Sequence, residues 1–338
     1  MNEEIFEASL TDEMLRRIRG SSVVSGQTGG ISFYSPLERS FEAQKRWMMS
    51  PAFKADRVWD LLHGAYDVHQ HSGPSPHTER LFDELDLAIH GCYIGLGGIV
   101  FKEQFMPSTR SARIVQKVVD QWADEHKRKR IEIFGGVCLN YAVGGLNSDA
   151  VIASYRMGGK YVWLPNVDSN HHRLVVNEGV GQGMDLIDGE GRVVPKAREI
   201  LELIAQTDMV LGIGHQSTRE RLALVKEAVA LGIQRIEITH VNFPPSWLTP
   251  EQCKLFADLG AYISIYAIDD AYFSWDDVMA VYRAVGPERM LIASDRGHIS
   301  TGHPIDGLRR LIFGFMQSGV PDDHVRLMCQ TNPRNLLH

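Results

Sequence analysis

Four histidines and one aspartate of this 338-residue chain have the side chains and the spacing expected of a divalent metal site. His69 and His71 lie two positions apart at the end of an apolar stretch, so on an extended chain both imidazoles point to the same side. Two such imidazoles can bind one cation at roughly 2.0–2.1 Å. His215, His240 and Asp295 each end a later apolar stretch. A lone histidine is more often structural, but the joint pattern predicts a metal site.

Lys102 is a further candidate, because it ends the second apolar stretch of the same region. A buried, neutralised lysine amine can form a carbamate that bridges two metal ions. Alternatively, Lys102 binds an anionic substrate as a cation, or it lies on a solvated loop. We therefore count Lys102 among both the candidate ligands and the candidate catalytic groups, and the number of metal ions, one or two, stays open.

Other side chains near these positions are candidates for substrate binding. An arginine can pair with a substrate carboxylate in a bidentate manner. Loop histidines either rim the site or are simply exposed, and a tyrosine that ends a strand either binds substrate or fills the core. The candidates are Arg80, His172, Arg173, Tyr266, Arg296 and His298, with His171 and His303 as further loop histidines at the rim.

The elements that must position these residues alternate along the chain. Short, continuous apolar runs bounded by glycine or polar residues are typical of strands buried on both faces. The runs predict strands at 65–69, 98–101, 131–138, 160–164, 209–213, 235–239, 261–266 and 290–294. Amphipathic stretches predict helices at about 78–91, 109–127, 147–158, 195–206, 217–231, 249–259, 274–285 and 305–318. Eight strands alternating with eight helices predict an α/β fold of the (β/α)8 TIM-type barrel class, with a doubly wound sheet as the alternative.

Two segments fall outside this alternation. Residues 1–60 predict an N-terminal helical extension, which packs on the barrel or on a partner subunit, ahead of a barrel domain at 61–338. Residues 166–194 exceed what one connection needs and contain the turn sequence Asp188-Gly189-Glu190-Gly191. Long loops in compact domains are usually functional, so we expect this one to cover the site.

Composition favours a small molecule as the partner. The net charge of −7 and a single basic run, Lys127 to Arg130, argue against nucleic acid. We see no apolar stretch long enough to span a membrane and no secretory signal at the N-terminus. The four cysteines are far apart, which fits a reducing cytosol. We expect a cytoplasmic enzyme with no nucleic-acid or membrane partner, either monomeric or a homo-oligomer.

The pattern resembles the amidohydrolase superfamily, over roughly residues 64–338. The resemblance rests on His215, His240 and the motifs Asp67-Val68-His69-Gln70-His71, Ser294-Asp295 and Asn332-Pro333-Arg334-Asn335-Leu336-Leu337. It implies a distorted (β/α)8 barrel with a mono- or binuclear metal centre. His69, His71, His215 and His240 would then be ligands. Asp295 would bind metal and act as general acid and base on the attacking water.

One position departs from the superfamily. Binuclear members usually have a carboxylated lysine or a glutamate after the fourth strand, whereas this chain has Leu164-Pro165-Asn166 there. Lys102, after the second strand, is the lysine that could bridge instead. Zinc suits the donor set best, and manganese and iron are not excluded by ligand type.

The resemblance implies a metal-dependent hydrolase that cleaves an amide, a cyclic amide, a lactone or an ester. Two alternatives stay open. One is a metal-dependent non-oxidative decarboxylase, in which His240 is a catalytic or substrate-contacting residue. The other is a barrel that binds metal or ligand without turnover, which would have no need of the proton shuttle at Asp295.

Overall fold

The computed structural model describes residues 57–338 except 81, 177–181 and 269–272. The predicted N-terminal extension therefore lies almost entirely outside the described residues. No helix in the described part of the chain is long and apolar enough to cross a membrane.

All eight predicted strands are present, and most of their residues are buried, as continuous apolar runs require. The segment 131–138 is wrong as a single strand. Its break lies at Gly135, where Ser108 approaches so closely that an added Cβ would lie 2.5 Å from the Ser108 carbonyl oxygen. The strands are β1 (Tyr66–Gln70), β2 (Gly98–Phe101), β3 (Glu132–Phe134), β4 (Gly136–Cys138), β5 (Tyr161–Trp163), β6 (Val210–Ile213), β7 (Ile236–Ile238), β8 (Tyr262–Tyr266) and β9 (Met290–Ala293).

The strands form two parallel sheets in which spatial order follows chain order. One has the order β1-β2-β3 and the other β4-β5-β6-β7-β8-β9. A doubly wound sheet, the alternative architecture, would reverse its strand order at one point. The described strands show no such reversal, so this alternative is not supported. Beyond the ends of β9 and β1, the amide of Asp295 donates to the carbonyl of His69 (2.9 Å) and that of His71 to Arg296 (2.9 Å). The α/β class with parallel strands is confirmed, and closure into one barrel stays a prediction.

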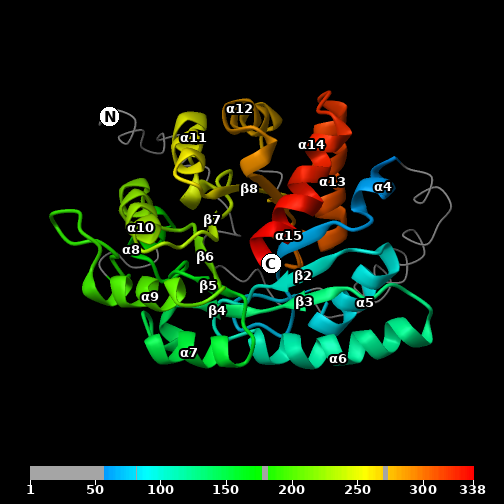
Figure 1. Ribbon diagram of the computed structural model, residues 1–338, viewed down its shortest axis with the longest axis horizontal. Helices are drawn as coiled ribbons and strands as arrows, with labels where there is room; N and C mark the ends of the chain where they lie inside the picture. Colours follow the sequence, from blue (N-terminus) through cyan, green and yellow to red (C-terminus); the bar gives the residue numbers. More distant parts are fainter. Residues whose placement is uncertain (1–56, 81, 177–181, 269–272) are drawn as a thin grey trace.

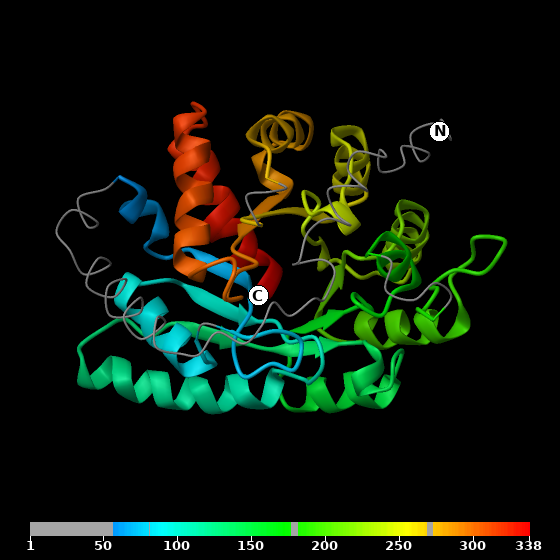
Figure 2. The same cartoon turned by 180° about the vertical axis from the view of Figure 1, so that it is seen from behind.

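Helices form the outer layer around the strands (Figure 1), and the view from behind shows the same arrangement (Figure 2). The helices of the alternating pattern are α5 (Glu84–Ile94), α6 (Thr109–Glu125), α7 (Ser148–Arg156), α9 (Pro195–Ala205), α10 (Thr218–Ala230), α11 (Pro250–Asp258), α12 (Trp275–Val285) and α13 (Pro304–Gln317). Outside that pattern are α4 (Val58–Leu62), α8 (Asn170–Val176), α14 (Asp322–Arg326) and α15 (Asn332–Leu337).

Local capping explains where α5 begins. The stretch 78–91 was the expected helix, but α5 starts at Glu84 because the side chain of Asp83 caps the amide of Asp86 and Asp86 caps Asp83 in return. The residues before this capping box, including Arg80, are consequently free to form a loop. That loop pairs with the loop after β9 through an antiparallel bridge between Arg80 and His298.

The long segment after β5 contains α8 and the expected hairpin turn. Ile187 and Val193 form an antiparallel bridge, and the amide of Gly191 donates to the carbonyl of Asp188. Ser169, at the start of the segment, donates its hydroxyl hydrogen to the carbonyl of His215 (2.7 Å). The segment is thus fastened to the loop after β6, while a role as a lid stays a prediction.

Candidate metal centre

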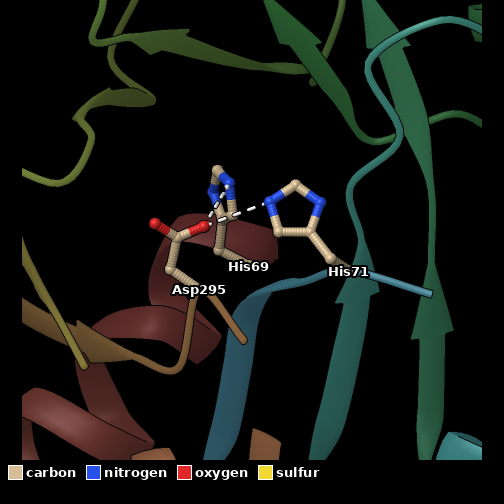
Figure 3. Close-up of side chains that lie close together, drawn as sticks. All are labelled: His69, His71 and Asp295. Carbon is tan, nitrogen blue, oxygen red and sulfur yellow. Dashed lines mark hydrogen bonds and ion pairs between the residues drawn. The ribbon is translucent and has the colours of Figure 1, made fainter. Parts of the chain in front are cut away.

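His69, His71 and Asp295 form a compact group at the carboxyl ends of β1 and β9. One ligand atom from each lies within 4.8 Å of the others. Oδ1 of Asp295 is 3.1 Å from Nε2 of His71 and 3.5 Å from Nε2 of His69. Figure 3 shows the three side chains converging on one point from two strand ends that are far apart in sequence. Both imidazoles are buried, and two imidazoles with one carboxylate are a donor set that zinc and other divalent ions accept.

Two nitrogens of this group have no hydrogen-bond partner among the described residues. They are Nε2 of His69 and Nδ1 of His71, both fully enclosed. A buried polar atom without a partner costs about 1–3 kcal/mol, so such atoms are rare unless a ligand satisfies them. Burial also lowers the pKa of both histidines well below the usual value, which leaves the neutral form that binds metals. The residues present therefore fit a bound cation.

A hydrogen-bonded chain beneath His69 fixes the orientation of its ring. The hydroxyl of Tyr266 donates to Oε1 of Glu237 (2.7 Å), so its oxygen can accept the hydrogen on Nδ1 of His69 (3.0 Å). Nε2 of His69 is then left without hydrogen and turned toward Asp295. Glu237 is completely buried and also accepts hydrogen bonds from Tyr161 and Ser264. Partners of this kind hold metal-binding histidines in position.

Sequence reasoning missed Glu237 as a functional residue. It is the one charged side chain within Ile236-Glu237-Ile238, which we interpreted only as a buried strand. A carboxylate in such a run needs hydrogen-bond donors from neighbouring strands, and this requirement was the available signal.

Asp295 is partly buried among charges of both signs. Burial raises the pKa of its carboxyl group to about 7, against the lowering effect of the positive charges on Lys102 and Arg80. Its backbone has φ of 50°, and that of His240 has φ of 36°. Positive φ at residues other than glycine is uncommon, and such strain concentrates at functional sites.

His215 and His240 form a second pair beside the first group. Their Nε2 atoms are 3.1 Å apart, and Nδ1 of His215 is 2.7 Å from Nδ1 of His172. The rings of His69 and His240 have centroids 5.6 Å apart, so all four histidines lie together. Gly214 is required here, because a Cβ would lie 2.1 Å from the Thr239 hydroxyl oxygen. The three-ligand group nevertheless contains neither His215 nor His240.

Lys102 is buried, so its assignment to a solvated loop is wrong. Only 2% of the residue is exposed, and its ammonium nitrogen lies 5.7 Å from the centroid of the Trp163 ring. Burial lowers the pKa of the amine. Both remaining interpretations, carbamate and substrate-binding cation, are compatible with this burial, and the geometry does not distinguish them.

The candidate substrate-binding residues divide into two groups. His298 lies beside His71, with ring centroids 5.0 Å apart, Tyr266 contacts His69, and His172 contacts His215. Arg80 is buried, and none of its three guanidinium nitrogens has a hydrogen-bond partner in the described part of the chain.

Arg173 and Arg296 belong to the second group, because their guanidinium groups already bind the protein. Arg173 pairs with Asp168 (2.5 Å), and Arg296 donates to the carbonyls of Ala267 (2.8 Å) and Thr301 (2.5 Å). A substrate contact by either stays a prediction.

Two loop histidines also have partners inside the protein. The expected place of His303 on the rim is wrong, since it is 2% exposed and its ring bonds His90 (2.9 Å). The ring of His171 is largely enclosed, and its Nε2 lies 3.1 Å from the carbonyl oxygen of Pro245.

The fold has relatives among solved structures. A probable dipeptidase, PvdM, from Pseudomonas aeruginosa has a TM-score of 0.58 at 12% identity, covering 86% of this chain and 98% of that one. An amidohydrolase from the same organism has a TM-score of 0.50 at 12% identity, with the same coverage. A metallopeptidase from Rhodobacter sphaeroides has a TM-score of 0.52 at 11% identity, covering 82% of this chain and 99% of that one. These identities show a shared fold alone, and the resemblance to the amidohydrolase superfamily is confirmed at that level.

Sequence comparisons give a narrower result. A search of curated proteins gives no match. One family model matches residues 64–264, a span that includes His69, His71, Lys102, His215 and His240. The match extends over more than half of the chain, and the chain therefore belongs to that family, described as a family of unknown function (DUF6282).

Proposed function

We propose that this protein is a metal-dependent hydrolase that cleaves an amide, cyclic amide, lactone or ester bond of a small molecule. The observation that carries the proposal is the convergence of His69, His71 and Asp295 with buried nitrogens left unpaired. The names of the structural relatives, a probable dipeptidase and a metallopeptidase, favour a C–N bond. We further infer that the two sheets belong to one distorted (β/α)8 barrel, since β9 and β1 meet at the site.

His69, His71 and Asp295 would hold the first divalent ion, with zinc the best suited to two imidazoles and a carboxylate. His215 and His240 would complete its ligand shell or bind a second ion, because their Nε2 atoms face each other at 3.1 Å. Lys102 would supply a bridging carbamate in a two-metal site, or a positive charge toward the substrate in a one-metal site. When bound, the cation polarises the scissile carbonyl and increases the acidity of water.

The residues of the chain would move the proton and hold the geometry. Asp295 accepts a proton from the attacking water and delivers it to the leaving group. Its Oδ1 atom faces the two histidines, so Oδ2 is the oxygen available to water and substrate. Tyr266 and Glu237 keep the ring of His69 in the orientation that leaves Nε2 free. The segment after β5 would exclude bulk water.

The first experiment measures metal content per chain by elemental analysis on protein purified without chelator. We expect at least one equivalent in the wild type, and a loss in His69→Ala/His71→Ala because both ligands of β1 are removed. His126→Ala, which removes an exposed histidine on α6's C-terminal side, is the matched control and should keep its metal. No metal in the wild type, even after incubation with zinc, manganese or iron, contradicts the ligand assignment.

The amount of metal separates the alternatives. About two equivalents per chain favour a binuclear hydrolase with Lys102 as the bridge. About one equivalent favours a one-metal site in which Lys102 binds the substrate, and it makes the decarboxylase alternative stronger. Candidate substrates are then screened for both carbon dioxide release and hydrolysis. Bound metal without turnover on either screen would favour a binding protein.

A further inference from the structure

We propose that Arg80 binds a carboxylate group of the substrate, beside the metal centre. This inference rests on the proposed function in so far as the bound carboxylate belongs to a substrate. Binding of a carboxylate at Arg80 does not itself require turnover. It narrows the substrate class from any amide, lactone or ester to one that carries a carboxylate near the scissile bond.

The guanidinium of Arg80 is unusual in having nothing to bind. The residue is 6% exposed, and Nε and both terminal nitrogens have no hydrogen-bond partner in the described part of the chain. Arg221, by contrast, is a buried arginine with a partner: it is 1% exposed and donates to the carbonyl of Ser246 (2.7 Å). Burying a charge without a partner is strongly unfavourable, so a structural role would have produced partners as it did for Arg221.

Nearby carboxylates do not neutralise Arg80. Glu103 and Asp295 are close enough to act on it electrostatically, but neither forms an ion pair with it. The Glu103 carboxylate instead accepts hydrogen bonds from the amides of Gln104 (2.8 Å) and Phe105 (3.0 Å). Burial lowers the pKa of Arg80 only to about 10, so the group is charged at neutral pH.

The backbone holds Arg80 against the metal centre. Its bridge to His298 joins the loop after β1, which carries His71, to the loop after β9, which carries Asp295. The amide of Ile299 donates to the carbonyl of Glu79 (3.3 Å) and extends this contact. The ring of His298, the backbone partner of Arg80, has its centroid 5.0 Å from that of His71 and 6.4 Å from that of His77. A ligand bound to Arg80 would therefore lie beside the loop that carries His71.

The chemistry of the pocket favours a carboxylate over other anions. A planar guanidinium with all its donors free matches a carboxylate in a two-pronged arrangement. Phosphate offers oxygens of the same kind, but at pH 8 it carries a second negative charge. Asp295 and Glu103 would repel that charge, whereas a single negative charge meets one guanidinium.

The test is calorimetric titration of the full chain, with its metal bound, with N-acetylglycine. Its amide, N-acetylglycinamide, is the uncharged control, and inorganic phosphate at pH 8 is a separate arm. We expect Arg80→Met to weaken N-acetylglycine binding roughly tenfold or more, the effect of losing a charged hydrogen-bonded pair. Arg198→Met, which removes an exposed arginine on α9, should leave the affinity unchanged. N-acetylglycinamide should bind more weakly than N-acetylglycine to the wild type, and equally to wild type and Arg80→Met.

A second readout separates binding from a structural role. Without ligand, Arg80→Met should have a melting temperature equal to or above that of the wild type, because it removes a buried charge that has no partner. If Arg80→Met fails to fold, Arg80→Lys keeps the charge but loses the planar fork, and should weaken N-acetylglycine binding without lowering stability.

Equal affinity of the wild type and Arg80→Met for N-acetylglycine would overturn the inference. So would a folded Arg80→Lys variant that binds N-acetylglycine as tightly as the wild type does. A third contrary result is phosphate binding that depends on Arg80 and is tighter than the binding of N-acetylglycine. The metal content of the wild-type protein distinguishes this outcome from failure of the proposed function. Arg80-dependent binding in a wild-type protein that takes up no metal supports the carboxylate site and contradicts the hydrolase. Bound metal with Arg80-independent binding does the reverse.

Discussion

Two clusters of buried polar side chains lie one above the other in this protein, and they differ in how their hydrogen bonds are satisfied. In the lower cluster Glu237 accepts from Tyr161, Ser264 and Tyr266. In the upper cluster, at the strand ends, His69 and His71 each keep an enclosed nitrogen with no partner among the described residues. Because folding penalises unpaired buried groups, the chain alone explains the lower cluster, whereas the upper one leaves polar atoms that a bound ligand would satisfy.

Neutralising one carboxylate in each cluster should have the largest effects, on the turnover rate for the upper cluster and on stability for the lower one. Asp295→Asn should lower kcat roughly 10²–10⁴-fold on a substrate found by hydrolase screening, because the proton carrier is lost. It should keep its stability, since Asn tolerates positive φ. It should also keep metal, since His69 and His71 are unchanged and the amide oxygen of Asn can still bind a cation. Glu237→Gln should instead lower the free energy of unfolding by about 1–3 kcal/mol, because hydroxyl donors lose an acceptor.

Steady-state kinetics, elemental analysis and denaturant unfolding of both variants check this contrast. Unchanged kcat in Asp295→Asn would refute its role as the proton carrier. A Glu237→Gln variant as stable as the wild type would show that the lower cluster does not depend on the charge.

The hydroxyl of Tyr266 contacts both clusters, so its removal tests whether the lower cluster supports metal binding by the upper one. Tyr266→Phe removes the hydrogen bonds to both His69 and Glu237. We expect metal affinity to fall about 10–100-fold, the usual effect of losing a partner of a metal-binding histidine. Tyr161→Phe is the matched control, because it loses a hydrogen bond to Glu237 but contacts no ligand histidine through its hydroxyl.

Competition with a chromogenic chelator measures both affinities. Equal affinities in Tyr266→Phe and Tyr161→Phe would mean that the orientation of His69 does not depend on the cluster beneath it.

The upper cluster was largely predictable from sequence and the lower one was not. His69, His71 and Asp295 follow buried apolar runs, and parallel strands bring their carboxyl ends to one edge, so the strand pattern alone places these residues together. Glu237 lies inside such a run. Its function depends on donors from β5 and β8, and which residues on those strands face it is determined by strand register, which a single sequence does not show.

Side-chain pairing was equally hidden. Arg80, Arg173 and Arg296 were equivalent candidates by type and position. Only the structure shows that Arg173 and Arg296 bind the protein, while the guanidinium of Arg80 has no hydrogen-bond partner within the described ranges. Helix boundaries also depend on local caps that we did not predict. The late start of α5 was missed because its capping box uses two aspartates rather than the Ser or Thr with Glu or Gln of the usual pattern.

Glu84, at the start of α5, is intermediate between the two clusters in how far its hydrogen bonds are satisfied. Its substitution gives the smallest predicted effect. Glu84 is a partly buried carboxylate that accepts one side-chain hydrogen bond, from the hydroxyl of Ser111 (2.9 Å), whereas Glu237 accepts three. Burial raises its pKa to about 7, with Glu103 and Asp83 adding to the rise. Between the unfolded value of roughly 4.5 and 7, the folded state keeps a proton that the unfolded state has released. The stability contributed by this group is therefore complete below the lower value and is lost as the pH rises through 7.

Glu84→Gln stays neutral at every pH, so it should remove this slope. We expect equal free energies of unfolding at pH 4 and a variant more stable by on the order of 1–2 kcal/mol at pH 8. Glu251→Gln, at an exposed position in the first turn of α11, is the control and should preserve the slope of the wild type. Denaturant unfolding across pH 4–8 decides the matter. The contrary result is that the free energies of unfolding of Glu84→Gln and the wild type fall in parallel with pH. The protein would then tolerate a carboxylate with few partners without loss of stability. Unpaired buried groups, such as those of the upper cluster, would in that case be weaker evidence for a bound ligand.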